Sequence, residues 1–239
     1  VQGCANAIEK CFKDAGFPEY LFKNLQIPSK MVSGVIENNK ITGVAFTGST
    51  LAGKAVAKKA GEFLKKIILE LGGNDPYIIL DDADIEKAVK ACIESRLANT
   101  GQSCISAKRL IVTNKNLLSF TNKLIQVLKS KVVGDPYDEV DVGPLVSLNA
   151  RDEVQELVSE SVQLGAKVKL GGKIPKTKGA YYPITVMTNV KPGMPAFDEE
   201  IFGPVFSIIQ ANNDEDAIHL ANNSNCLLYT SPSPRDKRQ

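Results

Sequence analysis

Short apolar runs alternate with helical repeats in the first third of the chain. Apolar side chains recur at helical spacing over residues 4–15, and Gly16 followed by Pro18 predicts where that helix ends. The alternation predicts parallel β/α units with right-handed crossovers, as in part of a doubly wound nucleotide-binding sheet. The expected elements are strands at 20–27, 41–46 and 65–71, a short helix at 29–37, and a helix from the turn at 47–50 to about residue 61.

The alternation starts again after residues 72–76, a run of glycine, asparagine, aspartate and proline that is typical of a domain junction. Strands are expected at 77–80, 109–112, 168–170, 182–187 and 205–210, and helices at 84–98, 117–128, 149–164 and 214–222. The pattern therefore predicts an α/β protein with a second α/β domain.

The last segment, residues 226–239, has no periodicity and contains Pro232 and Pro234. Residues 226–236 resemble the translation of a sequencing-library adapter. We predict that native sequence stops near Asn225 and that the segment is not native. A natural disordered tail is the alternative.

Composition indicates a soluble globular protein. The 239 residues are 43% hydrophobic and 23% charged, and 29 basic and 27 acidic residues are scattered along the chain, so neither a nucleic-acid-binding stripe nor an acidic tail is indicated. No apolar run approaches the roughly 20 residues of a membrane span, and the first ten residues do not resemble a signal peptide. The chain begins with Val rather than Met, which already indicates a fragment.

The cysteines and the histidine restrict the chemistry. The cysteines are Cys4, Cys11, Cys92, Cys104 and Cys226, an odd number without a Cys-x-x-Cys pair, which argues against a disulfide framework or a zinc ribbon and favours a reducing, cytoplasmic compartment. The single histidine, His219, excludes a multi-histidine metal site and is expected on an amphipathic surface helix. We therefore expect no metal, and a carboxylate as any general base.

Three segments are candidates for chemistry. Gly48 and Ser49 lie between a predicted strand and a predicted helix, where backbone N–H groups can bind a phosphate, although an ordinary tight turn reads the same way. Glu70 ends an apolar strand, where doubly wound proteins place functional groups, and a solvated charge at the strand end is the alternative. Cys104 follows a polar turn and is the nucleophile candidate, whereas Cys4, Cys11 and Cys92 occupy apolar helical positions expected in the core.

Residues 1–225 as a whole resemble the middle of the aldehyde dehydrogenase superfamily. Four segments match in order and at the family's spacing: Phe46-Thr47-Gly48-Ser49-Thr50, Leu69-Glu70-Leu71-Gly72-Gly73, Asn99-x-Gly101-Gln102-x-Cys104 and Glu199-Glu200-Ile201-Phe202-Gly203-Pro204-Val205. The second and third are the family's active-site signatures.

The resemblance implies an oxidoreductase that uses NAD or NADP. Cys104 would attack the aldehyde as a thiolate to give a thiohemiacetal, and Glu70 would activate the water that hydrolyses the resulting thioester. Ser49 would contact the pyrophosphate, Glu200 the nicotinamide-side ribose, and Phe202 would pack near the nicotinamide. Gly48 and Leu71 also match cofactor-binding positions of the family.

The resemblance also implies a partial chain. Residues 1–73 would be the C-terminal part of the dinucleotide-binding domain and 74–225 a truncated catalytic domain. The family's first cofactor strands, an oxyanion-hole asparagine and the oligomerisation strand would lie outside the sequence. We therefore expect the 239 residues alone to be inactive, and a homo-oligomer for the full-length protein, with no nucleic-acid or membrane partner.

Within the family, the sequence most resembles bacterial succinate-semialdehyde dehydrogenases. The similarity lies in residues 71–76, 99–102 and 134–136, with Asn74 in place of a common lysine. Many members of that subfamily bind the substrate carboxylate with an arginine where this chain has Ala98, and Arg96 is an uncertain substitute. Another small aliphatic or ω-carboxy aldehyde therefore remains an alternative.

Two other classes compete with this interpretation. A non-catalytic protein on the same fold would have no need for Glu70 and a polar-loop thiol at Cys104, so their presence favours an enzyme. A reductive relative acting on acyl phosphates or acyl-CoA generally lacks the Glu70 base. The choice between NAD and NADP is left open, because the strand end that reads the adenosine 2′ position would precede Val1.

Overall fold

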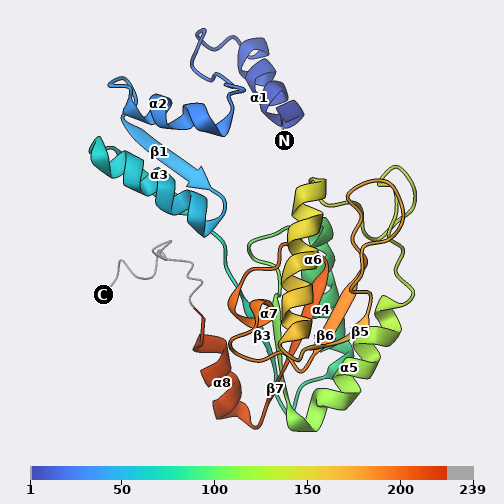
Figure 1. Cartoon of the computed structure of the whole chain (residues 1–239). Helices are drawn as coiled ribbons and strands as arrows, with labels where there is room; N and C mark the ends of the chain where they lie inside the picture. Colours follow the sequence, from blue (N-terminus) through green and yellow to red (C-terminus); the bar gives the residue numbers. More distant parts are fainter. Residues whose placement is uncertain (1, 225–239) are drawn as a thin grey trace. The chain divides into compact units, whose positions relative to one another are not determined.

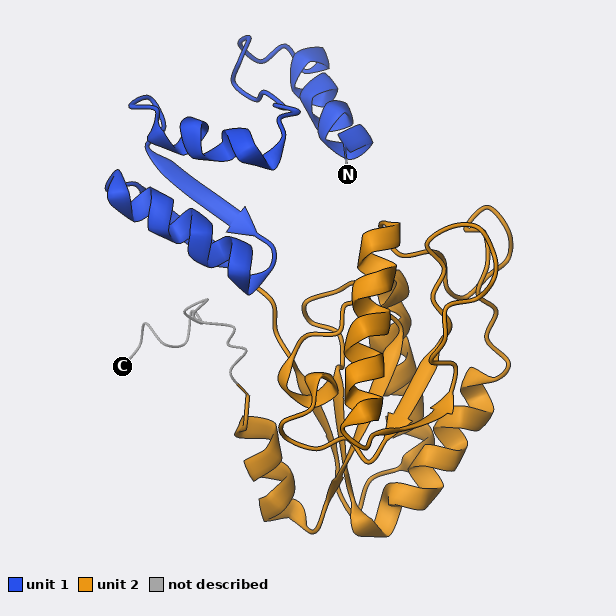
Figure 2. Cartoon of the chain, in the orientation of Figure 1, with its two compact units in different colours: residues 1–70 blue, residues 71–239 orange. Residues whose placement is uncertain are grey.

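The computed structural model describes residues 2–224. Its contacts divide the chain into two compact units, Val1–Glu70 and Leu71–Gln239 (Figures 1 and 2). The division falls at Glu70, shortly before the glycine-rich run at which the sequence placed a domain junction. Each unit is described separately below.

Unit 1 is built around two parallel strands. Strands β1 (Gly43–Thr47) and β2 (Lys66–Glu70) pair in register from Gly43–Lys66 to Thr47–Glu70. The chain between them forms helix α3 (Thr50–Glu62), whose N-terminus is capped by the Ser49 Oγ, which accepts from the Ala52 N–H at 3.3 Å. Before this β-α-β unit lie helix α1 (Gln2–Asp14), the 3₁₀ turn η1 (Ser29–Met31) and helix α2 (Val32–Glu37).

The strand predicted at 20–27 is wrong. Those residues form turns and irregular backbone, and Tyr20 has a left-handed φ of 68°. The Asn24 N–H donates to the Glu9 carboxylate of α1 at 3.0 Å, so a side chain satisfies a backbone group that a strand would pair in a ladder. Local apolar alternation alone did not reveal this competing partner.

The prediction that Cys4 and Cys11 are core thiols is also wrong. Both are exposed, because the described structure buries no residue of α1. The apolar face of α1 is covered only in part, where Phe12 packs against Phe17 and Phe22 at 5.3 and 5.2 Å between ring centroids. Cys92, by contrast, is buried as predicted.

Unit 2 contains a five-stranded sheet in the order β3-β4-β7-β6-β5 (Figure 1). All neighbouring strands are parallel except β5, which is antiparallel to β6. The strands are β3 (Pro76–Ile79), β4 (Arg109–Thr113), β5 (Lys167–Leu170), β6 (Thr185–Thr188) and β7 (Val205–Ala211). The helices are α4 (Ile85–Leu97), α5 (Asn114–Leu128), α6 (Leu148–Gln163), α7 (Pro195–Asp198) and α8 (Asp214–Asn222), with a 3₁₀ turn η2 (Ala98–Gly101) after α4.

Alternate side chains of the central strands enter two hydrophobic cores. Leu110 and Val112 of β4 join the core that α4 and α5 cover, whereas Ile111 between them joins the core on the other face, with side chains from α6, α7 and α8. This alternation follows from the two-residue period of a strand. Because β4 is buried on both faces, it is a rigid support for the residues that directly precede it.

Candidate active site

The turn at 99–101 holds three consecutive residues in left-handed backbone conformation. Asn99, Thr100 and Gly101 have φ values of 50°, 61° and 74°. Such backbone costs about 1 kcal/mol or more for each residue other than glycine. A Cβ on Gly101 would lie 2.3 Å from the Gly203 carbonyl oxygen, so only glycine fits there. The turn is thus strained, and the surrounding contacts must hold it.

Two side chains of the Asn-x-Gly-Gln motif stabilise this turn. The Asn99 Nδ2 donates to the Gln102 carbonyl at 3.0 Å, and the Gln102 Nε2 donates to the Asn99 carbonyl at 3.1 Å. The Gln102 Oε1 also accepts from the Val146 N–H at 2.8 Å, which ties the turn to a distant loop. The motif therefore builds the turn that precedes Cys104, whose side chain is exposed.

Arg96 connects the cysteine segment with the loop before β7. Its guanidinium is fully buried and donates to the Ser106 Oγ at 2.8 Å. The same group donates to three backbone carbonyls of the loop, those of Ile201, Gly203 (2.6 Å) and Val205 (2.7 Å). Burial lowers the pKa of Arg96 to about 9, partly opposed by the Glu200 carboxylate, so the guanidinium is still charged at neutral pH. Arg96 is therefore a support of the site and is not available to a substrate.

We expect Arg96→Met to destabilise the protein by about 3 kcal/mol or more, because it leaves several buried acceptors without donors. The measurement is urea unfolding followed by circular dichroism. Arg151→Met is the matched control, since Arg151 makes hydrogen bonds on the surface to Asp152 and Gly179, and it should cost no more than about 1 kcal/mol. Equal losses in the two variants would contradict this assignment of Arg96.

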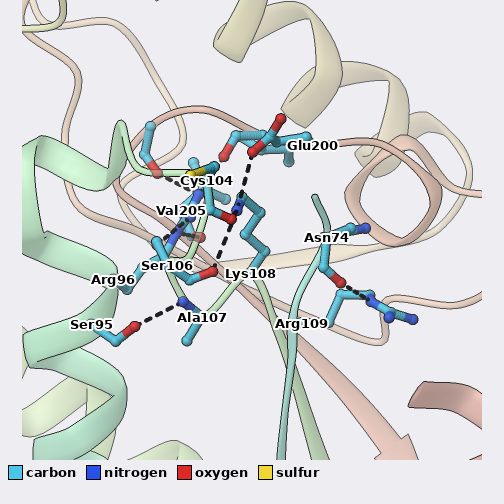
Figure 3. A network of polar contacts seen from close by, with 12 residues as sticks. Asn74, Ser95, Arg96, Cys104, Ser106, Ala107, Lys108, Arg109, Glu200 and Val205 are labelled. Carbon is cyan, nitrogen blue, oxygen red and sulfur yellow. Dashed lines mark hydrogen bonds and ion pairs between the residues drawn. The ribbon is translucent and has the colours of Figure 1, made fainter. Parts of the chain in front are cut away.

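The buried Lys108 and the half-buried Glu200 form an ion pair beside the Cys104 main chain (Figure 3). The Lys108 Nζ lies 3.1 Å from the Glu200 Oε1 and donates to the Cys104 carbonyl at 2.6 Å. The Glu200 Oε1 is buried and accepts no well-aligned hydrogen bond from the described residues. Its carboxylate occupies the space that a side chain at Gly72 would fill, because a Cβ there would lie 2.1 Å from the Oε2.

Glu70, Gly48 and Ser49 meet at one end of the strand pair in unit 1. Glu70 is the last residue of β2 and is exposed, and its carbonyl accepts from the Gly48 N–H at 3.0 Å. That N–H group is thus already bound by backbone. A Cβ on Gly48 would lie 2.6 Å from the tip of the Phe46 ring, which would have to move to make room for it.

The predicted site residues are divided between the two units. Cys104, Glu200 and Phe202 belong to unit 2, as does the half-buried Leu71, whereas Glu70 belongs to unit 1. The pairing of Glu70 with Cys104 therefore stays a prediction. Phe202 is 42% exposed, so its ring is accessible to a ligand.

The described residues give no support for a membrane span or a metal centre. Within residues 2–224, no helix is long and apolar enough to cross a membrane, and no three His, Cys, Asp or Glu side chains gather as metal ligands. Burial raises the pKa of the Cys92 thiol to about 12, so this thiol is neutral at physiological pH. Cys226 and the segment 226–239 lie outside the described residues, and the prediction that this segment is not native remains untested.

Comparison with known proteins decides the family. The sequence model of the aldehyde dehydrogenase family matches residues 1–231. The chain belongs to the aldehyde dehydrogenase family. The NAD(P)+-dependent succinate semialdehyde dehydrogenase of Escherichia coli K12 is 42% identical to this chain over 240 residues. The match covers 100% of this chain and 52% of that relative. This chain thus spans about half the length of the curated relatives it matches.

Solved structures confirm the α/β fold as that of an aldehyde dehydrogenase. Succinic semialdehyde dehydrogenase from Streptococcus pyogenes, in complex with NADP+, has a TM-score of 0.89 at 38% identity, over 93% of this chain and 49% of that chain. Lactaldehyde dehydrogenase from Escherichia coli also has a TM-score of 0.89, at 36% identity, over 92% of this chain and 47% of that chain. Two relatives named for different aldehydes thus share this fold.

Sequence reasoning missed Lys108 and the supporting role of Arg96. One signal was present in the sequence. Lys108 directly precedes β4 and Arg109 is its first residue, followed by three apolar positions, and cations at the start of a buried strand need partners. The positions of those partners, about a hundred residues away in the chain, could not be predicted from local pattern.

Proposed function

We propose that the natural protein carrying this sequence oxidises an aldehyde to a carboxylic acid with NAD or NADP, and that the substrate is succinic semialdehyde. The observation that supports this most is the exposed Cys104 thiol, which follows a strained motif turn and whose main chain is bonded to the Lys108–Glu200 pair. A thiol with only a packing role needs no such support.

Cys104 is proposed as the nucleophile. Its thiolate adds to the aldehyde carbon to give a thiohemiacetal, and its backbone N–H is one donor to the oxyanion. Oxidation leaves a thioester on the Sγ. Glu70 takes a proton from water as that water attacks the thioester carbonyl, and the acid is released together with the free thiol.

Each unit contributes candidate residues for a dinucleotide. The buried Glu200 Oε1, without an aligned donor among the described residues, suits a ribose hydroxyl. Ser49 caps the 13-residue helix α3, whose N-terminus favours a phosphate, and the accessible ring of Phe202 offers a packing surface. Gly48 and Leu71 are proposed as further cofactor-binding positions from the similarity to the family alone. The nicotinamide, when bound, accepts the hydride.

The proposed substrate is supported by relatives named succinate-semialdehyde dehydrogenase at about 40% identity. The structure adds a restriction. Arg96 is buried, and Ala98 stands where an arginine would bind the substrate carboxylate. Asn74 is buried as well, and its Nδ2 donates to the Phe197 carbonyl at 2.5 Å, so its similarity to the subfamily reflects packing. Another small aldehyde is therefore the second candidate.

A comparison of two aldehydes tests the substrate. Succinic semialdehyde and butanal have the same chain length and differ in the carboxylate. If a charged group of the site binds that carboxylate, kcat/KM for succinic semialdehyde should be at least about tenfold higher, the value of one charge-assisted hydrogen bond. Equal values, or a preference for butanal, would favour the second candidate while leaving the oxidation chemistry in place.

Compartment and assembly complete the proposal. The described cysteines are all free, which suits a reducing cytoplasmic location. A homo-oligomer is proposed from the family alone, and no nucleic-acid or membrane partner is proposed.

A further inference from the structure

Lys108 contacts both halves of the proposed site in unit 2. It is 3% exposed, and its Nζ lies 3.1 Å from the Glu200 Oε1, 2.6 Å from the Cys104 carbonyl oxygen and 3.5 Å from the Ser106 carbonyl oxygen (Figure 3). The ammonium group thus donates hydrogen bonds to the two carbonyls and contacts the Glu200 carboxylate as an ion pair. We propose that Lys108 is a positioning residue that couples cofactor binding at Glu200 to the position of Cys104. This inference rests on the proposed function.

The coupling follows from the charges. A buried ammonium needs an anionic partner, and in the described structure Glu200 is the carboxylate within ion-pair distance of Lys108. A ribose hydroxyl that binds the Glu200 carboxylate competes for the same oxygen. The hydrogen bonding of Lys108 then shifts towards the Cys104 carbonyl, so the state of Glu200 alters the main chain that holds the nucleophile.

The backbone around Lys108 and Glu200 is held in place, so their side chains are the groups that respond to a ligand. Arg96 fixes the backbone of the 201–205 loop to Ser106, so the two segments keep their spacing. The absence of a side chain at Gly72 is what allows the Glu200 carboxylate to lie here, because a Cβ there would lie 2.1 Å from its Oε2. Since the linkage is reciprocal, a displacement of the Cys104 main chain also changes cofactor affinity, whereas loss of the Sγ alone leaves the Lys108 contact to the Cys104 carbonyl in place.

The test is the rate at which iodoacetamide alkylates Cys104, measured with and without saturating NAD+ or NADP+. The natural protein is used, and peptide mass spectrometry separates Cys104 from the other cysteines. We expect cofactor to change the rate by about fivefold or more, the lower range of coupling between sites. In Lys108→Met, which keeps the length of the side chain and removes its charge, the change should fall below about twofold.

Two further variants make the result specific. Lys90→Met is the matched control, because Lys90 pairs with Glu94 at 3.8 Å on the exposed surface of α4, and it should respond to cofactor like wild type. Glu200→Gln removes the other half of the pair and should lose the response even at saturating cofactor. If Lys108→Met does not fold or does not bind cofactor, the response of Glu200→Gln decides whether the coupling exists.

The outcomes separate the coupling from the proposed function. If wild type binds cofactor and oxidises aldehyde but shows no change at Cys104, the coupling is wrong. It is also wrong if Lys108→Met, or Glu200→Gln in its place, keeps the full response. If wild type binds neither NAD+ nor NADP+, the proposed function fails and the coupling fails with it.

Discussion

Replacing Cys104 by alanine should lower aldehyde turnover by at least about a thousandfold in the natural protein, because no other group can form the thioester. Cofactor affinity should change little, since the proposed ribose and phosphate contacts come from Glu200 and Ser49. The measurement is kcat with succinic semialdehyde, together with the Kd of NAD+ or NADP+.

The other described cysteines serve as matched controls. Cys4 and Cys11 are exposed on α1, and Cys92 is a buried thiol whose pKa is raised to about 12 by burial. Alanine at each of these positions should leave kcat within about twofold. A Cys104→Ala variant with wild-type turnover would refute the nucleophile assignment.

Replacing Glu70 by glutamine should slow thioester hydrolysis by about a hundredfold or more, the usual contribution of a general base. Hydride transfer should be slowed much less, because the main task of the carboxylate is to activate water. Rapid mixing should therefore show a burst of reduced cofactor, followed by slow turnover.

The matched control is Glu62→Gln, at an exposed glutamate near the end of α3 that pairs with Lys59 at 3.2 Å. It should turn over like wild type, without an added burst. Equal slowing of both steps in Glu70→Gln, with no accumulated acyl-enzyme, would show that Glu70 has another role.

Most of the secondary structure could be predicted from the sequence, for a physical reason. Strands and helices alternate over most of unit 2, and β4 and β7 are mainly apolar runs buried on both faces, which local pattern reveals directly. The failures lie in unit 1. Within residues 20–27, a backbone N–H is bonded to a side chain of α1 instead of a neighbouring strand. Both cysteines of α1 are exposed, so the local pattern overestimated how much of this helix is buried.

The site could be predicted only in part. Motifs and spacing gave Cys104, Glu70 and Glu200 as candidates through the resemblance to the family, and these roles stay predictions. They did not predict that Asn99 and Gln102 bond each other across a left-handed turn, or that Lys108 lies between Cys104 and Glu200. The Lys108–Glu200 contact joins residues far apart in the chain, and the contacts within 99–104 are local but need the left-handed backbone that the tertiary structure holds.

The most direct test of the account is to trap the acyl-enzyme. The Glu70→Gln protein is mixed with succinic semialdehyde and oxidised cofactor, quenched in acid, digested, and analysed by mass spectrometry. We predict a succinyl thioester on the peptide that contains Cys104, formed only when oxidised cofactor is present. A wild-type enzyme that oxidises the aldehyde while Cys104 stays unmodified in the variant, or an adduct on a different residue, would contradict covalent catalysis by Cys104.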